Sequence, residues 1–320
     1  MKKCLLITLS LTLIVLAFSH WKEKSNWKKE WKLFKQEALS SGKDPTSLKK
    51  AKPLIKKKPA QNPPAAPAWK YLETFSVQFS DLPTSGQEKL KEYSSLLNSL
   101  QESYGVDPAY LITIWRIETN YGSFMGSYPV LQALAKQAFT GSHKAYYKKE
   151  LLLAIQMLEE NAVSLEQFVG DAYGGTGQPQ FLPSSWFAYA VDFDDDGHKN
   201  IWTSVPDVLA SIANYLASNG WKRGEPCLLE VMIPNDLPPK DLTPHSKKPL
   251  SQWLKLGITP LNQDLLPFQD LEASLQKIPQ GKNSFTFFLT FKNFEVLQRY
   301  NHAPVYAAFV GRCSQELSHP

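Results

Sequence analysis

Apolar residues recur at helical spacing near the start of the chain. Over residues 21–40 the apolar positions follow the order i, i+4, i+7 and i+11, and they are occupied by Trp27, Trp31, Phe34 and Ala38. Lysines occupy the opposite face. Such a helix either docks on the body of the protein by its aromatic face, which is the favoured interpretation, or lies on an anionic membrane surface. The Lys- and Pro-rich stretch 51–68 is expected to be an exposed linker.

The same periodicity predicts most of the remaining elements. Further helices are expected over 85–100, 128–138, 146–160, 205–219, 293–299 and 304–316. Between the first two of these, Asp107 can cap a helix that has Pro108 in its first turn and Gly122 as its stop. Its interior offers little polar surface, so it should be buried.

The sequence pattern changes after Trp221. Strands are expected over 228–233 and 285–291, whereas 234–284 is Pro-rich with short segments. The fold class is therefore mainly α, of the α+β kind, with a small β-containing segment.

The N-terminus has the pattern of an export sequence. Met1-Lys2-Lys3 precedes an apolar run from Cys4 to Phe18, which is short for a membrane span and typical of a secretory signal. Residues 1–19 are therefore interpreted as a signal peptide, or as an N-terminal anchor if they are retained. Cys4 precedes the apolar run, so a lipoprotein anchor is not supported.

Charge is divided unevenly along the chain. The net charge is +5, but residues 1–58 carry 15 Lys and four acidic residues, so residues 59–320 sum to −6. A mildly acidic body argues against nucleic acid as a partner.

Without the signal, Cys227 and Cys313 remain, and they either form a disulfide or are two buried free thiols. The histidines have no zinc-ligand spacing, and no organic cofactor is expected.

Glu118 is the sharpest candidate for catalysis. It lies at the end of the apolar helix, beside Trp115 and Ile117, where burial should raise the pKa of its carboxyl. A carboxyl that is still protonated near neutral pH can donate its proton to a leaving oxygen. The structural alternative is a Glu paired with Arg116, with a Lys or with a backbone amide.

Two further motifs follow one another closely. In the first, Gly174 to Phe181, glycines allow the backbone to approach a ligand, and Gln180 adds a polar group. In the second, Asp192, Asp194 and Asp196 stand at positions 1, 3 and 5 of an EF-hand-like loop, with Gly197 at the sharp turn. His198 offers its backbone carbonyl, but Thr203 replaces the usual acid at position 12. The alternative is an acidic surface turn that caps the next helix.

The segment Ile114 to Gly122 resembles the catalytic helix of the membrane-bound B family of lytic transglycosylases, which have a lysozyme-like fold and cleave peptidoglycan. The similarity extends over roughly residues 27–316 and includes Tyr104-Gly105-Val106, the Gly-rich stretch with Gln-Phe-x-Pro-Ser-Ser, the aspartate loop, Ala213-Asn214-Tyr215 and Arg299-Tyr300-Asn301. Each motif is weak alone, but their order and spacing together are specific. The residue patterns make 20–68 a basic amphipathic helix with a Pro- and Lys-rich linker. The resemblance implies that 69–320 is the lysozyme-like transglycosylase domain.

The resemblance also implies a single-carboxylate mechanism. Glu118 would protonate the oxygen between N-acetylmuramic acid (MurNAc) and N-acetylglucosamine (GlcNAc), and then act as base while the muramoyl C6 hydroxyl attacks C1. The product is a 1,6-anhydro end. The remaining site residues follow from the same resemblance. Gln180 would hold acetamido groups together with the Gly174–Gly177 backbone, which includes Gly175. Tyr300 and Asn301 would form the far wall near Glu118, and Tyr121 and Tyr173 would either stack on sugars or pack internally. Asp207 would close a structural Ca²⁺ site.

Two positions depart from the family pattern. Asp171 stands where a Ser usually bonds the catalytic Glu, and Thr176 replaces a Met in what looks like a packing change. Asp171 could raise the Glu118 pKa by like-charge repulsion, position a water as the second carboxylate of a hydrolytic muramidase, or point to solvent. A third reading is a peptidoglycan-binding protein with impaired catalysis, against which the retained Glu118 and Gln180 argue.

The setting follows from the same reading. The expected partner is the peptidoglycan glycan strand, in the periplasm of a Gram-negative-type bacterium, and the protein is expected to be a monomer. Association with the inner membrane through the N-terminus would follow if residues 1–19 were retained.

Overall fold

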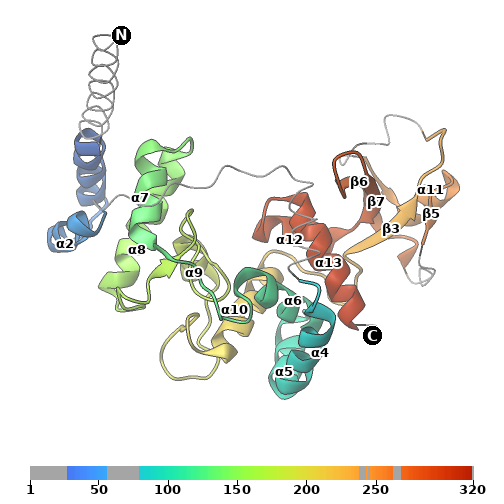
Figure 1. Ribbon diagram of the computed structural model, residues 1–320, viewed down its shortest axis with the longest axis horizontal. Helices are drawn as coiled ribbons and strands as arrows, with labels where there is room; N and C mark the ends of the chain where they lie inside the picture. The colour runs from blue at the N-terminus through green and yellow to red at the C-terminus, as the bar shows by residue number, and fades with distance from the viewer. Residues whose placement is uncertain (1–26, 56–78, 238–242, 244–245, 262–267, 319–320) are drawn as a thin grey trace, which may run out of the picture. The chain divides into compact units, whose positions relative to one another are not determined.

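The computed structural model describes residues 27–55, 79–237, 243, 246–261 and 268–318 (Figure 1). These residues divide into two compact units. The first comprises 27–55, 127–175 and 182–184, and the second comprises the other described residues. No helix within the described ranges combines the length and the apolar composition that crossing a membrane requires. The expected signal segment 1–19 and residues 56–68 of the linker lie outside the described residues.

The first unit is a small helical assembly. It contains the helix 27–40, α2 (Pro45–Ile55), α7 (Val130–Thr140) and α8 (Lys144–Glu159), with the short strands β1 (Tyr128–Pro129) and β2 (Val169–Gly170) paired antiparallel. Phe34 is fully buried, and its ring meets that of Phe139 edge to face with centroids 5.9 Å apart. Trp27 meets Phe139 in the same way, also at 5.9 Å. The preferred interpretation, a helix docked by its aromatic face, is therefore confirmed.

The first residues of the expected linker are helical. Residues 51–55 belong to α2, where Leu48, Ala51 and Ile55 are buried at i, i+3 and i+7. Pro53 lies inside this helix and misled the prediction, because Pro usually ends helical structure. The Lys residues around it remain exposed.

Helices of the second unit surround one that is almost wholly buried. The unit contains α4 (Leu82–Glu92), α5 (Ser94–Tyr104), α6 (Pro108–Thr119), α10 (Val205–Ser218), α12 (Lys292–Tyr300) and α13 (Pro304–Ser318). The last change from the first unit to the second along the chain falls within α9 (Pro183–Tyr189). Burial of α6 is confirmed, with nine of its 12 residues buried. The single helix expected over 85–100 is instead two helices, which break at Tyr93.

A five-stranded antiparallel sheet completes the second unit. Its strands are β3 (Leu228–Met232), β4 (Lys247–Pro249), β5 (Thr259–Pro260), β6 (Glu272–Pro279) and β7 (Phe285–Thr290), in the order β4-β6-β7-β3-β5. The sequence predicted β3 and β7. It missed β6, although β6 pairs with β7 over six residue positions, because its surroundings are rich in Pro.

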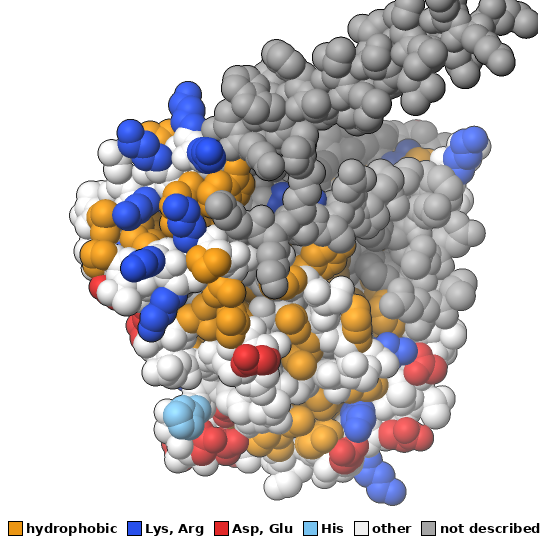
Figure 2. All heavy atoms as spheres, turned by 60° about the vertical axis from the view of Figure 1, so that its left-hand side comes forward, with side chains coloured by type: hydrophobic (Ala, Val, Ile, Leu, Met, Phe, Trp, Pro, Cys, Tyr) orange, Lys and Arg blue, Asp and Glu red, His pale blue; other side chains and the backbone are white. Residues whose placement is uncertain are grey.

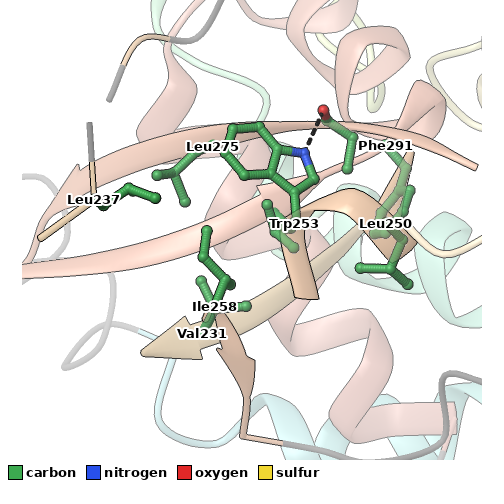
Figure 3. Packing of buried hydrophobic residues seen from close by; sticks show 9 residues of the cluster. Val231, Leu237, Leu250, Trp253, Ile258, Leu275 and Phe291 are labelled. Atoms are coloured by element: carbon green, nitrogen blue, oxygen red, sulfur yellow. Dashed lines mark hydrogen bonds between the residues drawn. The ribbon is translucent and has the colours of Figure 1, made fainter. Parts of the chain in front are cut away.

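One face of this sheet is covered by α11 (Leu250–Lys255). Trp253 of α11 is fully buried there, and its Nε1 donates to the carbonyl oxygen of Ala273 in β6 at 3.0 Å (Figure 3). The side chains that pack around it are Val231, Leu237, Leu250, Ile258, Leu275, Leu289 and Phe291. This core is separate from the buried helix α6 and gives the sheet its own support.

Both cysteines outside the N-terminal segment are free thiols in this structure. Cys227 is buried, and Cys313 is partly buried. Burial raises the pKa of Cys313 to about 12, with the carboxylate of Glu316 adding to the effect. Burial also raises the pKa of the Cys227 thiol well above its ordinary value. Both side chains therefore behave as small apolar residues.

Candidate active site

Local sequence signals fix both ends of α6. The Asp107 side chain accepts a hydrogen bond from the backbone N–H of Ala109 at 2.8 Å, and Pro108 occupies the first turn. The helix ends earlier than Gly122, because Asn120 adopts the left-handed conformation with φ 52°. Glu118 thus lies in the last turn and is half-buried.

Tyr306 is the hydroxyl partner of Glu118. Its phenol donates to Oε1 of Glu118 at 2.6 Å, which is the length of a charge-assisted hydrogen bond. Tyr306 comes from α13 and is 4% exposed. Burial, followed by the nearby Glu118 carboxylate, raises the pKa of Tyr306 well above 10.0, so this hydroxyl stays protonated and remains a donor. The sequence analysis missed Tyr306, because it fills an apolar position of a predicted helix.

Tyr300 lies beside this pair. Its ring stacks on that of Tyr306, with centroids 6.4 Å apart and planes inclined by 4°. Burial and the charge of Glu118 raise the pKa of Tyr300 as well. Its hydroxyl donates to the carbonyl oxygen of Pro179 at 2.7 Å, so Tyr300 anchors the Gly-rich stretch. Asn301 is exposed, and its side chain accepts from the backbone N–H of Ala303 at 3.1 Å, just before α13.

Gln180 is held in a strained but well-supported conformation. Its φ is 52°, and its amide nitrogen donates to the carbonyl oxygens of Gly177 at 2.8 Å and of Met125 at 3.2 Å. A non-Gly residue in this conformation costs free energy that the surroundings must offset, and such residues cluster at functional sites. The side chain is half-buried, which leaves part of it accessible to a ligand.

Tyr121 is engaged within the second unit. Its ring packs edge to face on Trp115 with centroids 5.2 Å apart, and Lys89 and Arg116 lie over it at 5.7 and 5.8 Å. Its hydroxyl is 3.2 Å from that of Ser85. These contacts favour the packing interpretation over sugar stacking.

The remaining predicted ligand-binding residues belong to the first unit. Oδ1 of Asp171 accepts from the backbone N–H groups of Tyr173 and Gly175, both at 2.8 Å. The turn also requires Gly174, which has φ +96° and lies where a Cβ would come within 2.2 Å of Leu134. Asp171 therefore organises its own loop. The ring of Tyr173 is 49% exposed.

The aspartate loop gathers three carboxylates. Ligand oxygens of Asp192, Asp194 and Asp196 all lie within 4.8 Å of one another. Because Ca²⁺ binds oxygen at 2.3–2.6 Å, two ligands on opposite sides of an ion are about 5 Å apart, so this spacing fits the ion. Gly197 has φ +90°, as the sharp turn requires.

Asp207 ties this loop to the start of α10. It is fully buried, and its two oxygens accept from the backbone N–H of Phe193 at 2.8 Å and of Asn200 at 2.7 Å. His198 donates its backbone N–H to Asp196 at 2.8 Å. The three-carboxylate cluster does not include Asp207 or His198, and their roles as ligands stay predictions.

Comparison with known proteins identifies the family. The model described as "Transglycosylase SLT domain" matches residues 17–315 of this chain. The chain belongs to the SLT transglycosylase family. This confirms the family that the Ile114–Gly122 segment resembles. It also confirms the expected enzyme class, lytic murein transglycosylase.

Individual relatives of this SLT transglycosylase agree with that assignment. The chain is 33% identical over 260 residues to membrane-bound lytic murein transglycosylase B of Escherichia coli K12, which covers 80% of this chain and 70% of the relative. It resembles SltB3 of Pseudomonas aeruginosa, solved in complex with NAG-NAM-pentapeptide, with a TM-score of 0.78 and 31% identity over 92% of this chain and 80% of that one. It also resembles Slt35 of E. coli, solved in complex with calcium, with a TM-score of 0.68 and 28% identity over 92% of each chain.

These similarities settle the fold class of the SLT transglycosylase. A mainly α chain with some strands and a lysozyme-like fold is confirmed. An aspartate cluster that could hold a metal is also present.

Proposed function

We propose that Glu118 is the single catalytic carboxyl of a peptidoglycan lytic transglycosylase that cleaves the MurNAc-β-1,4-GlcNAc bond. The observation that carries this proposal is the 2.6 Å hydrogen bond from the buried Tyr306 hydroxyl to a half-buried carboxyl at the end of a buried helix. A donor fixed on one oxygen orients the carboxyl for proton transfer.

The reaction then needs one residue in two roles. Glu118 donates its proton to the glycosidic oxygen as the bond to muramoyl C1 breaks. The resulting carboxylate removes the proton of the C6 hydroxyl while O6 bonds to C1, which closes the 1,6-anhydro ring and restores the protonated carboxyl. No water is consumed. Ordinary glycosidases use a second carboxylate where this reaction uses the substrate's own hydroxyl.

The loops around Glu118 would bind the sugars. Gln180 is fixed by two carbonyl oxygens, which suits it to hold an acetamido group. Tyr300 and Asn301 would form one wall of the cleft. Asp171 and Tyr173, with Gly174 and Gly175, would be the substrate-binding residues of the first unit.

The second candidate, a hydrolytic muramidase that uses Asp171 as its second carboxylate, is less well supported. Its Oδ1 already accepts two backbone N–H groups within its own loop, which favours a structural role over activation of water. Asp171→Ser restores the residue that is usual in the family. If wild type yields reducing ends and the variant yields anhydro ends, Asp171 is the second carboxylate of a muramidase.

The first experiment is mass spectrometry of the products released from purified sacculi in the presence of Ca²⁺. Muropeptides lighter by one water than their reducing counterparts support the transglycosylase, and Glu118→Gln should abolish them while binding to sacculi persists. Reducing products support the muramidase. If wild type and Glu118→Gln are equally inert, the chain is a peptidoglycan-binding protein and the proposal fails.

Calcium is proposed as a structural ion of the aspartate loop. Three clustered carboxylates support this, and so does the calcium complex of the related Slt35. Asp192, Asp194 and Asp196 would be side-chain ligands, with the His198 carbonyl and Asp207 as further ones. The ion would stiffen the loop that precedes α10.

We place the enzyme in the periplasm, acting as a monomer on glycan strands. The N-terminal export pattern and the cell-wall activity of its relatives support this location. Membrane association is proposed through the N-terminus if residues 1–19 are retained, and the exposed lysines of the helix 27–40 and α2, among them Lys28, Lys32, Lys35, Lys49 and Lys52, would add electrostatic attraction to an anionic surface. Figure 2 shows Lys and Arg side chains lying among hydrophobic ones on the face turned forward.

A further inference from the structure

A buried glutamine joins the helix that carries Glu118 to two loops. Gln178 is 7% exposed, and both halves of its side-chain amide are paired. Its Oε1 accepts from Nε1 of Trp115 in α6 at 2.6 Å, and its Nε2 donates to the carbonyl oxygen of Trp202 at 2.9 Å. The amide thus connects α6, the Gly-rich stretch and the segment that leads into α10.

The backbone of Gln178 repeats the same connections. Its carbonyl oxygen accepts from Oγ1 of Thr119, the residue after Glu118, at 2.9 Å. Its N–H donates to the carbonyl oxygen of Ile201 at 2.9 Å. Four hydrogen bonds therefore converge on one residue, two of them from the last turns of α6.

The chain that follows Glu118 is packed against the same amide. Oγ1 of Thr119 accepts from the backbone N–H of Gly122 at 3.2 Å. Gly122 has φ +80°, and a Cβ there would lie 2.4 Å from Oε1 of Gln178. Only glycine leaves room for the Gln178 side chain at this turn.

The loop on the far side of the amide also contacts the Gly-rich stretch directly. Nε1 of Trp202 donates to Oγ1 of the buried Thr176 at 3.2 Å. Thr176 is thus a hydrogen-bond acceptor as well as a packing residue. Trp202 follows the aspartate loop by a few residues, so the network joins the segment after that loop to α6.

We propose that Gln178 is a positioning residue that fixes the last turn of α6, and with it the Glu118 carboxyl, relative to the Gly-rich stretch. This inference rests on the proposed role of Glu118. In this mechanism Gln178 does not bind the substrate. It acts through Trp115 and Thr119, whose positions determine where Glu118 points.

The chemistry of the site explains why a glutamine is needed. An indole N–H requires an acceptor and a backbone carbonyl requires a donor, and a neutral amide offers both. Methionine has a similar size but would leave Nε1 of Trp115 and the Trp202 carbonyl unpaired in a buried place. Glutamate offers both functions only when protonated, and burial raises the pKa of a carboxyl by up to about 3–5 units. The partners named for Gln178 carry no charge that would oppose this shift.

The test compares Gln178→Met and Gln178→Glu with wild type in the full chain, on purified glycan strands. We expect kcat to fall at least about tenfold for Gln178→Met with KM within about twofold, because a misplacement of about 1 Å can cost about 10²-fold in rate. For Gln178→Glu, the ratio of variant to wild-type kcat should rise at least about fivefold from pH 8 to pH 5, since protonation restores the amide-like pairing.

Controls separate this role from general stability and from the proposed function. Thr290→Val removes a buried hydrogen bond to Ser274 in the sheet and should lower the melting temperature while leaving kcat unchanged. If Gln178→Met does not fold, Trp115→Phe removes the same hydrogen bond and should lower kcat similarly. Wild-type kcat in Gln178→Met, or a ratio for Gln178→Glu that is flat with pH, overturns the inference. Activity in Glu118→Gln instead overturns the proposed function.

Discussion

Tyr306→Phe tests the central hydrogen bond of the site. The change removes one oxygen atom and keeps the ring that stacks on Tyr300. The lost bond is 2.6 Å long and reaches a carboxylate, and such bonds contribute about 1.5–3 kcal/mol. If that bond orients Glu118 in the transition state, kcat should fall about 10- to 100-fold.

The pH profile gives a second readout of the same change. A hydrogen bond to an ionised carboxyl stabilises the charged form, so its removal should raise the pKa of Glu118. The general acid acts while protonated, and activity is lost as pH rises through that pKa. The descending limb of the profile should therefore move to higher pH in Tyr306→Phe.

Release of soluble muropeptides from sacculi, followed from pH 4 to 9, measures both effects. Tyr110→Phe is the matched control, because it removes another buried hydroxyl from the same unit, next to Cys227. That control should retain wild-type kcat. If Tyr306→Phe keeps kcat within about twofold of wild type and the limb does not move, the hydrogen bond has no part in catalysis.

Three further changes probe the supports of the site by thermal unfolding. Ca²⁺ at 100 times its dissociation constant should stabilise wild type by about 2.7 kcal/mol, and Asp194→Ala should remove that gain. If Ca²⁺ does not change the unfolding temperature of wild type, the loop is not an ion site. Phe34→Ala should cost about 3–5 kcal/mol, whereas Leu33→Ala, at a 45% exposed position, should cost far less. Gly174→Ala should lower the free energy of unfolding by more than about 2 kcal/mol, because a Cβ there meets Leu134. The control is Gly224→Ala, which has open space around it, and an equal loss of stability in both variants would refute the clash.

Periodicity and capping signals predicted the helices well, because each depends on residues close in sequence. Asp107 and Pro108 fixed the start of α6, and the apolar run after them required its burial. The same signals failed where tertiary contacts decide. Tyr93 interrupts a continuous apolar pattern, and β6 is a strand because β7 pairs with it, in a stretch whose prolines suggested loop.

In the candidate site, too, the sequence predicted the residue with a local signal and missed the one that depends on tertiary contacts. Glu118 stands out locally as a carboxyl on an apolar helix, whereas Tyr306 is 188 positions away and fills one place in an ordinary amphipathic pattern. Nothing in the helix Pro304–Ser318 marks one of its aromatic residues as the partner of an acid. Such a partner becomes visible only when α6 and α13 are packed together.

Local sequence does not distinguish the structural role of Gln178 from the ligand-binding role of Gln180. They are two residues apart in one stretch, and composition gives no ground for treating them differently. The backbone distinguishes them. Gln180 takes φ 52° and stays half-buried, while Gln178 is buried with its amide paired on both sides. A paired, buried amide cannot leave its partners without cost, so it holds the framework, and the half-buried one remains available to a ligand.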